Sequence, residues 1–246
     1  MKKITFALLL VLASTTLWAD CPTCYFYGGD FGGDLYSPTA RGYLYPDGLS
    51  NENSGIVRGD PYGSATYQNF VATGGITVSG LFTNNLSDLN PSTGYWEIRS
   101  GVSEGNGGTL IASGTSAMTQ TPTGRSAFGY TEYQDLVSGL SVNLTPDTYW
   151  FAVVPNDVNG GRSFNSNTTG WNSVGTQITN EQYWNSPFFG VNFINALEEG
   201  PNYPRFSSGV LAGSSQSPVP EPSGLVLLGS GLMGAAVAVR RRMIRR

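Results

Sequence analysis

The chain of 246 residues contains no histidine, and its only lysines are Lys2 and Lys3. Without histidine there is no imidazole general base, and neither a Ser-His-Asp triad nor a Cys-His pair can form. Without lysine in the body there is no amine nucleophile. The catalytic groups that remain in the body are carboxylates and tyrosine, which narrows the enzyme classes open to this protein.

Charge is also scarce, since charged residues make up 12% of the chain against about 25% in average soluble domains. Of 13 basic residues, two lie at the start and five in the last seven positions. The body between them has six arginines against sixteen acids, a formal charge near −10. An acidic body without a basic cluster argues against nucleic acid and anionic lipid as partners.

Only two cysteines occur, Cys21 and Cys24, in the sequence DCPTCYF. In an exported protein this pair is a candidate disulfide. A redox CxxC would need a helix N-terminus after a strand, whereas aromatic and glycine-rich residues follow here. Zinc prefers four N or S ligands, so we expect no metal cofactor. Asp157 and Asn159 in NDVNGG suggest calcium only weakly, and a hairpin turn explains them as well.

The first 19 residues have the pattern of a secretory signal peptide. Lys2 and Lys3 precede an apolar run over 4–13, and Ala19 precedes the expected cleavage point. Acylation of Cys21 as a lipoprotein is disfavoured by the Trp18 and Asp20 side chains before it. We therefore expect signal peptidase to process an exported chain.

The other end of the chain has three consecutive parts. The sequence Val219-Pro220-Glu221-Pro222 precedes an uncharged run over 224–239. Five arginines follow the run: Arg240, Arg241, Arg242, Arg245 and Arg246. As a helix the run would span about 24 Å, slightly less than the hydrocarbon core of about 30 Å, and the arginines would stay cytoplasmic. A buried last helix of the fold is disfavoured because the run has no polar face.

These three parts, in this order, resemble the bacterial PEP-CTERM protein-sorting signal. The resemblance implies recognition by an exosortase, removal of the helix, and display at the cell surface or release. It also implies an association with Gram-negative envelopes and exopolysaccharide, with the inner membrane contacted only transiently. The same motif carries the label ice-binding protein C-terminal domain, but we find no regular Thr-x-Thr ladder in the body.

The segment 66–212 predicts an antiparallel β-sandwich or jelly roll, because short alternating stretches are separated by Gly, Asn and Pro turns. In TGYWEIRSG, we expect Trp96 and Ile98 to face the core. DTYWFAVVPND is apolar on both faces, so this strand is predicted to be central. Residues 20–65 are a Gly- and Tyr-rich lead or edge strands, and 213–218 is a Ser/Pro linker.

Three body segments also resemble an uncharacterised β-sandwich PEP-CTERM family: YWEIRSGVSEGNGGTLIASGT, VSGLSVNLTPDTYWFAVVPN and TTGWNSVGT. This resemblance transfers no catalytic residue. Aromatic rings stack on sugars and amides bond their hydroxyls. Trp171, Tyr183, Trp184 and Asn185 lie in loop-like sequence and are therefore the candidate ligand-binding residues, with burial in the core as the alternative.

A carboxylate-dependent enzyme remains an alternative function. Glycosidases need two carboxyl groups about 5–10 Å apart, and sequence spacing does not show which acids converge. The candidates are Glu97, Glu104, Glu132, Asp135, Asp157 and Glu181. We expect a non-catalytic surface or matrix protein that binds exopolysaccharide or packs in the envelope. The alternatives are a secreted glycosidase or polysaccharide lyase, and a purely structural or adhesive protein.

Overall fold

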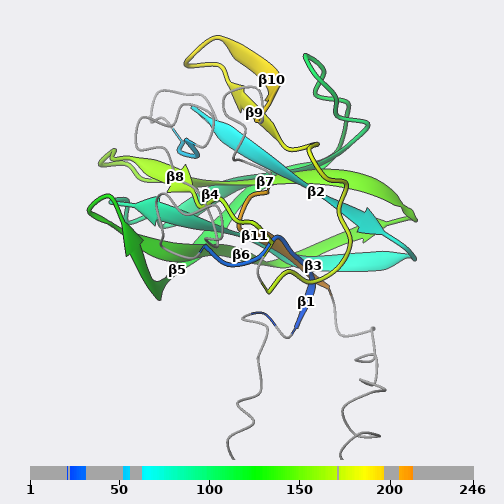
Figure 1. The fold of residues 1–246 in the computed structure, drawn as a ribbon, viewed down its shortest axis with the longest axis horizontal. Helices are drawn as coiled ribbons and strands as arrows, with labels where there is room; N and C mark the ends of the chain where they lie inside the picture. Colours follow the sequence, from blue (N-terminus) through cyan, green and yellow to red (C-terminus); the bar gives the residue numbers. More distant parts are fainter. Residues whose placement is uncertain are drawn as a thin grey trace, which may run out of the picture. The chain divides into compact units, whose positions relative to one another are not determined.

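The computed structural model describes residues 21, 23–31, 52–55, 63–170, 172–196 and 205–212, which belong to one compact unit, Met1–Gly213. The predicted signal peptide, the linker and the sorting signal lie outside the described residues. The regular elements of the described part are all strands, and this part contains no helix (Figure 1). Within that part, accordingly, no helix is long and apolar enough to cross a membrane. The predicted all-β class is confirmed.

Within the described residues, eleven strands form one continuous hydrogen-bonded sheet, and every pairing between these strands is antiparallel. The strands are β1 Cys24–Tyr27, β2 Ala65–Ala72, β3 Ile76–Ser87, β4 Thr93–Ser100, β5 Thr109–Ala127, β6 Tyr130–Leu144, β7 Asp147–Asn156, β8 Ser163–Asn165, β9 Tyr183–Ser186, β10 Val191–Asn195 and β11 Ser208–Ala212. Their order in the sheet is β1-β11-β3-β6-β5-β4-β7-β2-β9-β10, with β8 paired to β3.

Strand β5 folds this sheet into two packed layers, because it is shared between them. Its first half, Thr109–Ala117, pairs with β4, and its second half, from Met118 onward, pairs with β6. The first layer therefore holds β1, β11, β3, β8 and β6, and the second holds β4, β7 and β2. Only the first half of β2 pairs with β9, which pairs with β10, and these two short strands pack over the outer side of the second layer. We predicted only short strands, and β5 is longer than expected because it serves both layers.

The main hydrophobic core lies between the two layers. Its rings include Phe26, Phe70 and Phe151, whose centroids are about 6 Å apart (6.0, 6.2 and 5.8 Å). Trp96 and Ile98 of β4 belong to this core, as the alternation in TGYWEIRSG predicted. Burial of such rings supplies the largest favourable contribution to folding of this sandwich.

Strand β7 is central, and both of its faces are covered. It is hydrogen-bonded to β4 on one side and to β2 on the other. Its Trp150, Ala152 and Val154 side chains join a second buried cluster on the outer side of the second layer. Tyr183 of β9 and Phe193 of β10 cover that cluster. The prediction of a central strand from its two apolar faces is confirmed.

Both terminal strands of the sheet have their outer edges occupied. Tyr27 of β1 exchanges two backbone hydrogen bonds of 2.9 Å with Val174. On β10, the Phe193 carbonyl accepts from Gly105 N at 3.0 Å, and Asn195 N donates to Glu104 at 2.6 Å. Covered edges remove the unpaired backbone groups that promote strand-to-strand aggregation. The described part of the lead thus contributes an edge strand, one of the two alternatives for residues 20–65.

Candidate functional site

Three of the four predicted ligand-binding residues lie in a strand rather than a loop. Tyr183, Trp184 and Asn185 belong to β9 and are buried, with Trp184 only 1% exposed. The loop placement was wrong because β9 pairs with the first half of β2, setting Trp184 opposite Thr66. The Trp184 indole nitrogen donates to the Glu52 carbonyl at 3.1 Å. Neither the Tyr183 ring nor the Trp184 ring presents a face to solvent, and Trp171 lies outside the described residues.

Glu97 is a fully buried carboxylate whose oxygens are occupied. Its oxygens accept hydrogen bonds from Tyr67 Oη at 2.5 Å, Tyr95 Oη at 2.8 Å and Arg99 Nε at 2.5 Å. Arg99 also donates to the Gly107 carbonyl at 3.1 Å. Through Arg99, the Glu97 carboxylate holds the loop after β4 against the outer side of the second layer. The role of Glu97 is therefore to stabilise the fold.

Asp135 is buried between the two layers and, unlike Glu97, has carboxylate oxygens that accept no hydrogen bond from the described residues. It points inward, opposite Thr83 of β3 and Gln120 of β5. Burial raises the pKa of Asp135 to about 7, and the nearby Gln120 amide offsets only part of this effect. Burial thus favours the protonated, neutral form of this group over a pH range in which an exposed aspartate is ionised.

Asp157 closes a turn. Its oxygens accept from Asn159 N at 2.8 Å and Asn90 N at 2.7 Å, and these two bonds lower the pKa of Asp157. The NDVNGG sequence is therefore a turn, as we weighed against calcium, but it is not a hairpin because the strands it joins, β7 and β8, do not pair with each other. In the described ranges no group of three or more His, Cys, Asp or Glu could hold a metal ion.

The remaining candidate acids lie in separate places. Glu104 accepts the Asn195 amide at the edge of β10, and Glu132 lies on the outer side of the first layer. Glu181 is half-buried, and its carbonyl accepts from Trp150 Nε1 at 2.7 Å. The structure therefore places Glu97, Asp135 and Glu132 on three different sides of the two layers.

The sequence GVSEG over 101–105 has the G-x-S-x-G spacing of a nucleophile elbow. In the structure it is a turn between β4 and β5, in which Ser103 and Asn106 exchange two backbone hydrogen bonds of 2.9 Å. An elbow serine also needs a histidine base, and the chain has none. The GVSEG segment therefore shares the residue spacing of a nucleophile elbow but not its structure or its catalytic partner.

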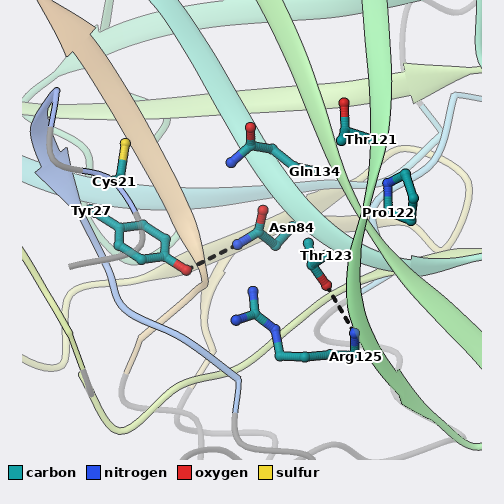
Figure 2. Close-up of a pocket in the computed structure, with 8 residues that line it drawn as sticks. All are labelled: Cys21, Tyr27, Asn84, Thr121, Pro122, Thr123, Arg125 and Gln134. Carbon is teal, nitrogen blue, oxygen red and sulfur yellow. Dashed lines mark hydrogen bonds between the residues drawn. The ribbon is translucent and has the colours of Figure 1, made fainter. Parts of the chain in front are cut away.

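A pocket of about 250 Å³ lies on the outer side of the first layer (Figure 2). It is bounded on one side by the segment that carries β1 and on the other by the second half of β5, with β3 and β6 between them. The lining residues are Cys21, Tyr27, Asn84, Thr121, Pro122, Thr123, Arg125 and Gln134.

Three of these side chains form one row across the strands. In the sheet register Asn84 of β3 is opposite Gln134 of β6, and Gln134 is opposite Thr121 of β5. Directly opposite residues of antiparallel strands point to the same face, and neighbouring strands are about 4.8 Å apart. The row therefore presents two amides and a hydroxyl to the pocket.

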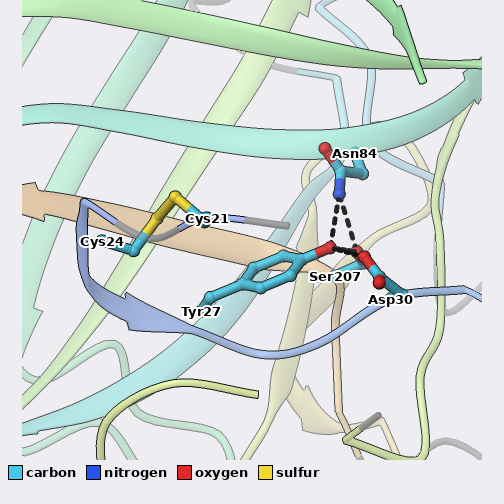
Figure 3. Close-up of a disulfide and its surroundings, with 6 residues drawn as sticks. All are labelled: Cys21, Cys24, Tyr27, Asp30, Asn84 and Ser207. Carbon is cyan, nitrogen blue, oxygen red and sulfur yellow. Dashed lines mark hydrogen bonds between the residues drawn. A yellow bond between two sulfur atoms is a disulfide. The ribbon is translucent and has the colours of Figure 1, made fainter. Parts of the chain in front are cut away.

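The orientation of the Asn84 amide is set by its neighbours. The Tyr27 hydroxyl donates to Asp30 at 2.6 Å, so its oxygen accepts from Asn84 Nδ2 at 3.1 Å (Figure 3). The same Nδ2 donates to Ser207 Oγ at 2.9 Å. Asn84 Oδ1 then points away from Tyr27, toward the Gln134 side of the pocket, and has no hydrogen-bond partner among the described residues (Figure 2).

The charges beside the pocket are paired with one another. Arg125 lies 3.0 Å from Asp30 and forms a second ion pair with Glu132. Burial is the largest single influence and lowers the pKa of Arg125, but the charge and hydrogen bond of Glu132, together with Tyr27 and Asp30, outweigh it, so the pKa is raised. Burial, and then Asp30, raise the pKa of Tyr27. The pocket thus has a neutral phenol and a guanidinium held between two carboxylates.

Cys21 and Cys24 form a disulfide with a Cα–Cα distance of 5.4 Å (Figure 3). The pair packs with Tyr27 and Phe82 on the outer side of the first layer. Backbone Cys24 N also donates to the Cys21 carbonyl at 3.2 Å. The disulfide therefore stiffens the segment that forms one wall of the pocket.

Residues 218–242 match the family model of the PEP-CTERM protein-sorting motif. The prediction of a sorting signal from VPEP, the apolar run and the arginines is confirmed by this match. The motif implies an exported protein that is held at the membrane by its sorting signal and processed by an exosortase. No curated protein and no solved structure matches the chain. The resemblance of the body to an uncharacterised family stays a prediction.

Proposed function

We propose that this chain, which carries the PEP-CTERM sorting motif, is a non-catalytic extracellular protein whose sandwich binds exopolysaccharide at the pocket beside Asn84. The observation that carries the proposal is the row of Asn84, Gln134 and Thr121, whose amide and hydroxyl groups face a concave site. Amides both donate and accept hydrogen bonds, as sugar hydroxyls do.

The chemistry of the neighbouring acids supports binding rather than catalysis. Asp30 and Glu132 are the carboxylates beside the pocket, and both are paired with Arg125. Thr123 Oγ1 also donates to Glu132 at 2.6 Å. A general acid needs a raised pKa and a nucleophile needs access to the substrate, and paired, hydrogen-bonded carboxylates favour neither.

The sorting motif leads to a prediction about the mature chain. We expect intact-mass analysis of the surface-associated or released protein to show a chain that ends near Pro222 rather than at Arg246. Expression of the same chain with Glu221→Gln should raise the fraction that keeps the tail, if this acid is part of what the exosortase recognises. Recovery of the parent protein with Arg246 still present would instead make the tail a permanent anchor.

Binding is tested on the exported protein with polysaccharide extracted from the matrix of the producing cells. Gln134→Ala should weaken binding about tenfold, because loss of hydrogen bonds worth about 1.4 kcal/mol changes an affinity by that factor. Asn143→Ala is a matched control, since Asn143 is an exposed amide on the same strand and does not line the pocket. Equal binding by parent and Gln134→Ala, or no binding by the parent, would contradict the proposal.

A further inference from the structure

Resting on the proposed function, we infer that the pocket takes a neutral sugar unit, one that donates a hydroxyl or amide hydrogen to Asn84 Oδ1, and discriminates against acidic units. Three properties of the pocket lead to this ligand class: an unused buried acceptor, a limited volume, and a cation that is already neutralised.

The first property is that Asn84 Oδ1, which accepts no hydrogen bond from the described residues, favours a ligand that supplies a hydrogen-bond donor. Asn84 is 1% exposed, and its observed orientation is favoured because a turned amide would place Oδ1 against the Tyr27 oxygen, whose own hydrogen is committed to Asp30. A buried carbonyl without a donor is unfavourable, so a ligand that brings an O–H or N–H to this atom gains more than one that brings another acceptor. Ethers and carboxylates bring acceptors only.

The volume and the register limit the size of the unit. About 250 Å³ is below the roughly 300–1,000 Å³ of pockets that enclose drug-sized ligands. The row from Asn84 to Thr121 spans two strand spacings, or about 10 Å, along which Gln134 supplies the middle group. These dimensions suit one or two sugar units of a chain, held by hydroxyls along one edge.

The charge of the pocket disfavours acidic sugars. Among the described residues that line it, the charged side chain is Arg125, and this guanidinium is already paired with Asp30 and Glu132. A uronic acid bound beside Arg125 would approach two carboxylates. The surrounding body, with six arginines against sixteen acids, adds a repulsive field at long range. A neutral sugar unit is repelled neither by the two carboxylates beside Arg125 nor by the acidic body.

The test compares defined polysaccharides on the processed, exported protein. The probes are dextran, galactomannan and chitin oligomers as neutral ligands, alginate and polygalacturonate as acidic ligands, and a permethylated form of the best neutral oligosaccharide. We expect at least one neutral probe to bind ten times more tightly than either acidic probe at 0.15 M salt. Gln134→Ala should weaken that binding, Asn143→Ala should not, and permethylation, which removes the hydroxyl donors, should reduce it at least tenfold.

The outcomes separate this inference from the function on which it rests. Binding of alginate or polygalacturonate that is tighter than neutral binding and sensitive to Gln134→Ala would overturn the neutral class while supporting a saccharide site. Equal binding of the permethylated oligosaccharide would overturn the donor requirement. If no defined probe and no matrix extract binds, the inference and the proposed function both fail.

Discussion

Asp135→Asn is expected to stabilise the protein above pH 7, by about 2–4 kcal/mol. Asp135 is 0% exposed, has no hydrogen-bond partner among the described residues, and has a pKa raised by burial to about 7. Between about pH 4 and 7 the unfolded chain loses this proton while the native state keeps it, so native stability falls as pH rises. Asparagine keeps the shape without the charge and lets its oxygen face Gln120.

Chemical denaturation of the parent and variant at pH 5, 7 and 9 measures this effect. The difference between them should increase from pH 5 to pH 7 and be largest at pH 9, and other titrating groups cancel in the comparison. Asp147→Asn, at the exposed first residue of β7, is the control and should change stability by less than about 0.5 kcal/mol at each pH. A variant that is less stable than the parent at pH 9 would show that Asp135 has a favourable partner in its ionised state.

Glu97→Gln is expected to have the opposite effect and to destabilise the protein by about 3 kcal/mol at neutral pH. Glu97 is also 0% exposed, but its oxygens accept from Tyr67, Tyr95 and Arg99. Glutamine replaces an acceptor with a donor that faces other donors, and it removes the charge of the carboxylate that pairs with the largely buried Arg99. Loss of the charge at Asp135 thus removes the penalty of burying an ionised carboxylate, whereas loss of the charge at Glu97 breaks hydrogen bonds and an ion pair that stabilise the fold.

Denaturation at pH 7 reports the global effect of Glu97→Gln, with Glu181→Gln as the control on a half-buried carboxylate. Hydrogen exchange gives a local measure, since Arg99 donates to the Gly107 carbonyl and thereby holds the loop after β4. Exchange in residues 103–108 should accelerate in Glu97→Gln more than in the control. Unchanged stability together with unchanged exchange would mean that the cluster contributes nothing to the fold.

The sequence predicted those parts of the fold that depend on alternation within one segment. Trp96 and Ile98 face the core, and β7 is central, because an apolar side chain at every second position specifies a face locally. Strand β9 was missed because four residues are too few to show a period, and its pairing with β2 decides its burial. The inward positions of Thr83, Asn85 and Asn165 were also hidden, since alternation assigns polar residues to solvent.

The candidate site could not be predicted for a related reason. Asn84, Gln134 and Thr121 come from three strands, and only the register of β3, β6 and β5 brings them into one row. Each residue alone is an ordinary polar side chain of a strand. The sorting motif could be identified because its parts are contiguous in the chain, so no tertiary pairing is needed to assemble it.

The pairing of β11 with β3 determines how mechanical load would pass through the protein. Cys24 lies opposite Leu211, and Leu211 lies opposite Gly80 of β3, the strand that carries Asn84. For a protein held through the residues after Ala212, tension on a sugar at Asn84 would travel from β3 to β11 within the first layer. The second layer and its buried cluster would stay outside this path, so tension on the sugar need not unfold them.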